Sequence, residues 1–165
     1  MLRPTPDPVR PGQTSVWDHP RPPALEPVGE RVRVEFGGRV IAESDEALQI
    51  LETSHPPTVY IPPADVELAS LVQSAKQSGC EWKGYAVYYD IEVGEERSVD
   101  AAWSYPSPRE QYAALKDHVA FYPGRVGACF IGDERVTPQP GGFYGGWITS
   151  RVAGPFKGIP GSMGW

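Results

Sequence analysis

One lysine stands beside a row of aromatic residues on a predicted β-hairpin. Lys83 lies in the segment CEWKGYAVYYD, residues 80–90, and the segment AAWSYP, residues 101–106, supplies a tryptophan and a further tyrosine. At the mouth of an aromatic cleft, an ammonium group can pair with a carboxylate or phosphate, and a partly desolvated amine can act as a base or nucleophile. The alternative is a strand-end lysine that pairs with Glu81 in solvent, which is worth at most about 1 kcal/mol.

A second group of candidate residues occupies the segment ETSHPPTVYIP, residues 52–62. Glu52 has the chemistry of a general base if burial raises its pKa, and is otherwise an ordinary carboxylate at a strand edge. His55 precedes two prolines that hold it extended, and it either titrates near neutrality as a ligand group or serves as a structural turn residue. Tyr60 either points into the same cleft as Lys83 or packs in the core.

The aromatic residues around Lys83 belong to a hairpin whose register the pattern predicts. A three-residue loop, residues 94–96, would place Val93 opposite Arg97. The same register gives four further pairs, which are Ile91 with Val99, Tyr89 with Ala101, Val87 with Trp103 and Tyr85 with Tyr105. These side chains would share one face, since strand residues alternate between faces, and a slip of one residue would bury Asp90.

This register predicts the composition of the cleft. Tyr85, Trp103 and Tyr105 form its aromatic wall, with Lys83 at its mouth. Strict alternation along the first strand places Cys80 on the face opposite Lys83, where a buried and inert thiol is expected.

The elements that must position these residues are mainly strands. Gly37-Gly38 is a two-residue hairpin turn that would place Phe36 opposite Arg39, Val34 opposite Ile41 and Val32 opposite Glu43. Further strands are predicted at residues 58–61, 119–122 and 126–131. Residues 47–51 suit either a helix or a strand, and the spacing of apolar residues favours a helix over residues 64–76.

Both ends of the chain are predicted to form extended arms around a central domain, residues 28–137. Residues 1–27 are rich in proline and should adopt polyproline II geometry, while residues 138–165 are rich in glycine and aromatic residues. A disordered N-terminal tail is the alternative, but Val16 and Trp17 are costly to leave in water. We expect the arms to lie on the domain itself or on a neighbouring subunit.

The charge distribution argues against nucleic-acid binding. The net charge is −6 at pH 7, and residues 138–165 carry two basic residues and no acidic one, so the negative charge gathers in the centre of the chain. An acidic centre repels phosphate backbones. No apolar run approaches the roughly 20 residues of a membrane helix, and the N-terminus lacks a signal-peptide pattern, so we expect a cytoplasmic protein without a membrane partner.

The sequence offers no pattern for a metal or a cofactor. Cys80 and Cys129 are too few for a disulfide framework, and neither belongs to a Cys-x-x-Cys pair. The spacings of the three histidines match no zinc motif. A phosphate-binding Gly-x4-Gly-Lys-Ser/Thr loop and a Gly-x-Ser-x-Gly elbow are both missing. We therefore predict a protein without metal or cofactor, with Cys129 in the core.

Four segments of the chain resemble a known family. ETSHPPTVYIP, CEWKGYAVYYD, AAWSYP and FYPGRV are similar to segments of the bacterial family of domains of unknown function numbered 427, over roughly residues 28–137. The resemblance implies a β-tent fold, in which two curved antiparallel sheets pack together with short helical segments. β-Tent proteins often hold zinc with two Cys-x-x-Cys pairs, which this chain lacks.

Two functions follow from these patterns. The first is the binding of a small molecule with an anionic or carbonyl group in an aromatic pocket, with Lys83 and Glu52 as acid–base residues and with Tyr60, Tyr85, Trp103, Tyr105 and His55 as ligand contacts. The second is a non-enzymatic interaction module, in which the arms dock on partner or sister chains and form a homo-oligomer.

Overall fold

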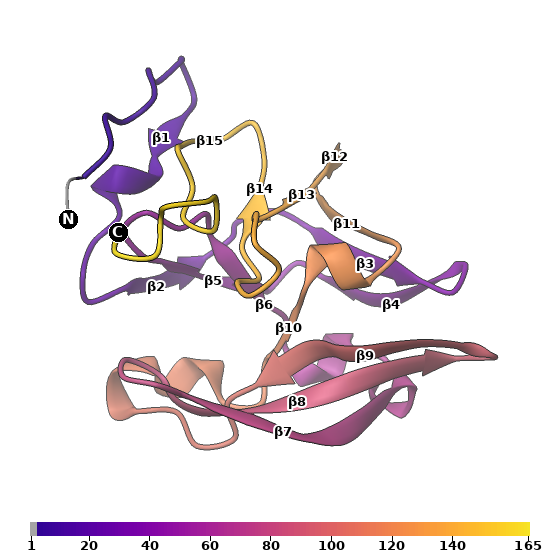
Figure 1. Ribbon diagram of the computed structural model, residues 1–165. Coiled ribbons are helices and arrows are strands. Elements are labelled where there is room, and N and C mark those ends of the chain that lie inside the picture. The colour runs from indigo at the N-terminus through magenta and orange to yellow at the C-terminus, as the bar shows by residue number, and fades with distance from the viewer. Residues whose placement is uncertain (1–2) are drawn as a thin grey trace.

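Two four-stranded antiparallel sheets form the main layers of the protein (Figure 1). The computed structural model describes residues 3–165. The lower sheet in Figure 1 has the strand order β10-β9-β8-β7, with β7 at Leu71–Cys80, β8 at Gly84–Val93, β9 at Glu96–Ser104 and β10 at Val119–Phe121. The upper sheet has the order β12-β11-β3-β4, with β3 at Val32–Phe36, β4 at Arg39–Ser44, β11 at Ala128–Ile131 and β12 at Glu134–Arg135.

Smaller sheets and single helical turns complete the fold. A three-stranded sheet consists of β2 (Ala24–Pro27), β5 (Leu48–Leu51) and β6 (Thr58–Tyr60). Two pairs of short strands are β13 (Thr137–Pro138) with β14 (Trp147–Ile148), and β1 (Thr14–Ser15) with β15 (Val152–Ala153). The 3-10 helices are η1 (Val16–Asp18), η2 (Pro63–Asp65), η3 (Leu68–Ser70), η4 (Glu110–Leu115) and η5 (Pro123–Arg125). The expected mainly β class, with antiparallel sheets and short helical segments, is confirmed.

No helix within residues 3–165 has the length and apolar character needed to cross a bilayer; the longest, η4, has six residues.

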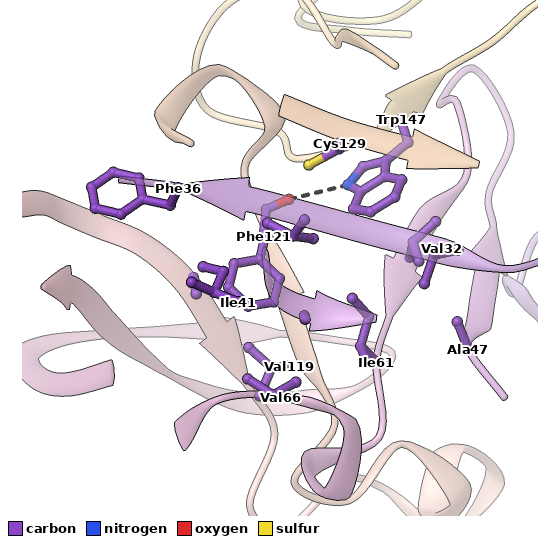
Figure 2. Close-up of a cluster of buried hydrophobic side chains, with 14 of the residues drawn as sticks. Val32, Phe36, Ile41, Ala47, Ile61, Val66, Val119, Phe121, Cys129 and Trp147 are labelled. Carbon is purple, nitrogen blue, oxygen red and sulfur yellow. Dashed lines mark hydrogen bonds between the residues drawn. The ribbon is translucent and has the colours of Figure 1, made fainter. Parts of the chain in front are cut away.

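An aliphatic core lies between the two main sheets (Figure 2). Val32 and Ile41 of the upper sheet meet Val119 and Phe121 of β10, and all four side chains are buried. The fully buried Trp147 closes this core from the C-terminal segment, and its indole N–H donates to the Phe121 carbonyl over 3.1 Å. The C-terminal segment is therefore part of the core packing.

A second, aromatic cluster lies on the other face of the same strands. In β10 and the residue after it, Val119 and Phe121 belong to the aliphatic core, whereas Ala120 and Tyr122 belong to the aromatic cluster. Since successive strand residues point to opposite faces, both faces of this strand are buried. The members of the aromatic cluster are Ile50, Tyr60, Ala86, Tyr88, Trp103, Tyr105, Tyr112, Leu115, Ala120 and Tyr122.

The first hairpin has the expected turn and a different register beyond it. Phe36 pairs with Arg39 around Gly37-Gly38, as predicted, but a bulge at Val34 moves the later pairs by one residue. Val34 therefore lies opposite Ala42, not Ile41. A bulge inserts a residue into one strand, and the turn residues carry no signal for it.

The predicted helix over residues 64–76 is wrong. η2 and η3 provide single turns, Val66 bridges to Ala42, and the chain then enters β7, which pairs with β8 from Leu71 onward. Pairing with a long neighbouring strand outweighs the weak helical spacing of this segment. Residues 47–51, for which the sequence allowed either a helix or a strand, contain the strand β5.

The register predicted for the β8–β9 hairpin is also wrong. The turn has two residues, so Val93 pairs with Glu96, and a bulge around Asp90 shifts the pairing again. Tyr88 therefore faces Trp103. Asp90, which was expected on the polar face, is 5% exposed; it accepts from Arg97 Nη2 at 2.6 Å and from the Asp100 N–H at 2.8 Å. These two donors compensate the burial of the carboxylate, which the hydrophobic pattern had placed outside.

Candidate functional site

A cavity of about 330 Å³ lies where the aromatic cluster meets the C-terminal segment. Its walls come from the residues after β5, from the turn between β7 and β8, from β9 and from residues 139–157. The lining includes Glu52, His55, Thr58, Tyr60, Ser78, Cys80, Glu81, Trp82, Lys83, Tyr88, Trp103, Tyr105, Tyr122, Gln139, Phe143, Tyr144 and Lys157. Except for Tyr85, every site residue predicted from the sequence is in this set.

Lys83 lies in the turn between β7 and β8, and its side chain joins the cavity wall. Its carbonyl accepts from the Arg109 N–H at 3.1 Å, and Gly84 has a φ of 105°, a conformation that favours glycine. A Cβ at Gly84 would lie 3.3 Å from the Ser107 carbonyl oxygen, so a neighbouring backbone uses the space that glycine leaves. These contacts fix the turn that carries the lysine.

Lys83 is a largely buried residue whose amine forms no ion pair within the described residues. The residue is 9% exposed, and Nζ lies 6.0 Å from the centre of the Tyr105 ring. The ion pairs found within residues 3–165 are all formed by arginines, and none involves Lys83. Charged groups in such positions are normally paired, and the other charged residues of this wall are Glu52, Glu81 and Lys157.

The aromatic wall is built from rings in mutual contact. Tyr60 meets Trp103 edge to face, with ring centres 6.2 Å apart, and its ring centre is also 6.2 Å from that of Tyr105. Trp103 packs against Tyr122 at 4.6 Å. Burial raises the pKa of Tyr60 and of Tyr105 above the ordinary value, so both phenols stay protonated near neutral pH. The wall therefore combines flat apolar surface with neutral hydroxyl groups.

His55 and Glu52 occupy the chain between β5 and β6. His55 Nδ1 lies 2.9 Å from the Thr53 carbonyl oxygen, which assigns the proton to Nδ1 and leaves Nε2 as an acceptor. Burial lowers the pKa of His55 below 6.5; Glu52 opposes this shift, whereas Lys157 and Lys83 reinforce it. His55 is therefore a neutral imidazole at pH 7, and the charges that act on it belong to the cavity.

The C-terminal segment supplies wall residues that the sequence patterns did not predict. Lys157 Nζ lies 5.8 Å from the centre of the Tyr144 ring and donates to the Trp165 carbonyl oxygen at 3.2 Å. Gln139 donates through Nε2 to the Lys157 carbonyl oxygen at 2.8 Å. A Cβ at Gly145 would collide with the Trp103 indole. The glycines between Tyr144 and Trp147 in the segment GGFYGGW were the sequence feature from which this close contact could have been inferred.

Two sequence-based placements need correction. Tyr85 is 75% exposed and lies outside the cavity wall, because the shifted register turns it away from the cluster and places Tyr88, not Val87, opposite Trp103. Cys80 lines the cavity together with Lys83, because residues 81–83 form a turn and strand alternation does not continue through it. Cys129 is 1% exposed in the aliphatic core, as expected.

Metal ligands do not gather in the described part of the chain. Over residues 3–165, no three side chains of His, Cys, Asp or Glu are close enough together to hold an ion.

The fold and the cavity define a mainly β protein with an aromatic-walled pocket that carries two lysines. A family model described as a domain of unknown function, DUF427, matches residues 24–132, and the chain belongs to this family. A search of curated proteins finds no match. The matched segment contains Glu52, His55, Lys83 and Trp103, whereas Lys157 lies beyond it. The family segment thus provides most of the wall, and the C-terminal segment closes it.

Proposed function

We propose that the cavity binds a small organic anion whose flat, apolar part lies on the aromatic wall. The observation that carries the proposal is Lys83, a residue 9% exposed whose amine forms no ion pair within residues 3–165 and which shares the cavity wall with protonated tyrosines. A bound carboxylate would provide the missing counter-charge, and low local dielectric would strengthen the pair. The cavity volume of about 330 Å³ suits a ligand of modest size.

The same wall holds groups for acid–base chemistry. Lys83 would hold an anionic group or polarise a carbonyl, and Glu52 would exchange a proton with the ligand, as the sequence also predicts. His55 adds a neutral acceptor nitrogen at the same wall, with its tautomer set by the Thr53 carbonyl. We therefore propose proton transfer to or from the bound anion as the reaction class of a catalytic site.

Ligand-observed NMR with a matched pair of probes tests the binding proposal. Phenylacetate carries a flat ring and a carboxylate, and phenylacetamide has nearly the same shape without the charge. We expect phenylacetate to bind more tightly than phenylacetamide, and Lys83→Met to weaken phenylacetate alone by about tenfold, the effect of one nearby charge. Lys116→Met, at an exposed position, is the control. Equal affinities for the two probes, or no change in Lys83→Met, would contradict the proposal.

The alternative function, self-assembly through the arms, has less support. Val16 and Trp17 are buried within the same chain, where the Trp17 indole N–H donates to the Pro155 carbonyl at 3.0 Å. The large apolar side chains that stay exposed in the C-terminal segment include Phe143 at 72% and Met163 at 90%. Size-exclusion chromatography of Phe143→Ser, compared with the unchanged protein, tests whether this surface joins two chains.

A further inference from the structure

Cys80 and Lys83 are brought to one cavity wall by a single turn. Cys80 is the last residue of β7 and pairs with Gly84, the first residue of β8, so residues 81–83 form the connection. Both side chains line the cavity, and the cysteine is half-buried. The sulfur therefore faces the same space as the unpaired amine.

Lys83 and Cys80 both influence the pKa of Tyr105, another residue of the cavity wall. Burial and the neighbouring Tyr60 raise the pKa of Tyr105, Lys83 lowers it, and Cys80 raises it. Lys83 Nζ lies 6.0 Å from the centre of the Tyr105 ring, and Tyr105 lines the cavity together with Cys80 and Lys83. A ligand whose carboxylate is bound at Lys83 would therefore occupy the cavity that Cys80 also lines.

We propose that Cys80 is a nucleophile toward carboxylic acids that carry a leaving group on the carbon beside the carboxylate. Lys83 binds the carboxylate, and the sulfur of Cys80 forms a bond to the adjacent carbon. The leaving group departs with its bonding electron pair, and the thiol proton passes to solvent. The product is a thioether on Cys80, and the step needs no oxidant or reductant. This inference rests on the proposed anion-binding function of the cavity.

The other cysteine provides an internal control. Cys129 is 1% exposed in the aliphatic core, and burial raises the pKa of its thiol. Since thiolates react and buried thiols in apolar surroundings are inert, Cys129 should remain unmodified in the folded protein. Peptide mass spectrometry distinguishes the two sites in one sample.

Competing alkylation by iodoacetate and iodoacetamide tests the proposal. Each reagent forms a sulfur–carbon bond and releases iodide, but only iodoacetate carries a carboxylate. The ratio of the two rate constants at Cys80 is compared with the same ratio for glutathione in the same buffer. We expect the Cys80 ratio to exceed the glutathione ratio by about tenfold and to fall toward it in 1 M salt, because screening weakens charge attraction.

Variants of Lys83 identify the source of the preference. Lys83→Met should reduce the ratio to the glutathione value, Lys83→Arg should retain most of it, and Lys116→Met should leave it unchanged. Circular dichroism and unmodified Cys129 report whether each variant is folded, and the salt titration of the unchanged protein provides a test that needs no variant. An unreactive Cys80, a glutathione-like ratio, or a ratio insensitive to Lys83 and to salt would overturn the proposal.

Phenylacetate binding, which can also be measured in Cys80→Ser, is compared with the alkylation of Cys80 to separate this inference from the binding function. If phenylacetate binding depends on Lys83 while Cys80 shows no preference for iodoacetate, the cavity binds anions and the nucleophile assignment is wrong. If neither experiment shows a dependence on Lys83, both proposals are wrong.

Discussion

A largely buried charged residue lies near each end of strand β8, and the two residues differ in the partners of their charged groups. Asp90 is 5% exposed, and its carboxylate is paired with Arg97 and hydrogen-bonded to the Asp100 N–H. Lys83, in the turn before β8, is 9% exposed, and no ion pair within residues 3–165 reaches it. Both residues are largely buried, but within the described part of the chain only Asp90 has partners that compensate its charge.

The contrast distinguishes a charge that the fold compensates from one for which we propose a ligand as the partner. Arg97 and the Asp100 N–H hold the pKa of Asp90 below its ordinary value, so the folded state stabilises the carboxylate that it buries. Lys83 instead lies in a cavity wall that is mainly aromatic, and none of the acidic residues in that wall forms an ion pair with it. A ligand anion is the group that would make the second arrangement equivalent to the first.

The largest expected effect is the loss of the partnered charge. Asp90→Ala removes the acceptor of the half-buried Asp100 N–H and the partner of Arg97, and should lower the free energy of unfolding by about 2 kcal/mol. Glu92→Ala is the matched control, because Glu92 also contacts Arg97, at 3.5 Å, but is 46% exposed; its effect should stay within about 0.5 kcal/mol. Urea unfolding at pH 7 measures both. Similar losses in the two variants would remove the distinction between buried and exposed partners.

The Asp90 end also shows where prediction from sequence stops. The strand identity of residues 84–104 and the turn at Gly37-Gly38 follow from local patterns, namely β-branched and aromatic residues flanking glycines. The register does not, because the bulge near Asp90 depends on the hydrogen bonds that its carboxylate receives from Arg97 and Asp100. A pattern that treats Asp as a surface residue therefore favours the wrong pairing.

The residues of the cavity also divide into those that the sequence patterns predicted and those that they did not. His55 and Lys83 were predictable as candidates, because His55 precedes two prolines and Lys83 stands between Trp82 and Gly84, and Glu52 was predictable as a carboxylate that follows an apolar stretch. Lys157 was not, because its place in the wall depends on how the C-terminal segment returns across Trp103. Contacts between segments so distant in sequence leave no local pattern from which to infer them.

The second prediction concerns the segment that closes the cavity. Gly145→Ala puts a methyl group against the Trp103 indole and should lower the free energy of unfolding by about 1–2 kcal/mol, the usual cost of overpacking. It should also weaken phenylacetate binding by displacing the wall. Gly124→Ala is the control, because its Cβ would meet only ordinary contacts at 3.7 Å. Thermal unfolding and NMR titration of both variants provide the check, and equal behaviour would mean that Gly145 is not a required close contact.

The third prediction uses pH, through the buried His19 of the N-terminal segment. Burial lowers the pKa of His19 below 6.5, against the smaller opposing effects of the Glu52 and His55 carbonyls and of the acidic residues Glu26 and Asp18. The unfolded chain therefore binds a proton more readily than the folded protein, so stability falls as the pH drops below 6.5. One such proton changes the free energy of unfolding by at most about 1.4 kcal/mol per pH unit.

His19→Asn distinguishes this contribution from that of His55. An asparagine amide can donate to the same carbonyls without titrating, so the variant should lose less stability between pH 7 and pH 5 than the unchanged protein. Urea unfolding at several pH values measures the slopes. Parallel curves for the two proteins would assign the pH dependence to His55 or to other groups.

The smallest expected change in stability has the opposite sign and tests the comparison most directly. Lys83→Met removes a buried ammonium that has no partner and keeps a side chain of similar length, so the free energy of unfolding should stay constant or rise by up to about 1 kcal/mol. Affinity for phenylacetate should fall in the same protein, which separates the binding role from stability. Urea unfolding beside Asp90→Ala provides the measurement. A loss as large as that of Asp90→Ala would mean that the Lys83 amine already has a structural partner, and the two ends of β8 would then be alike.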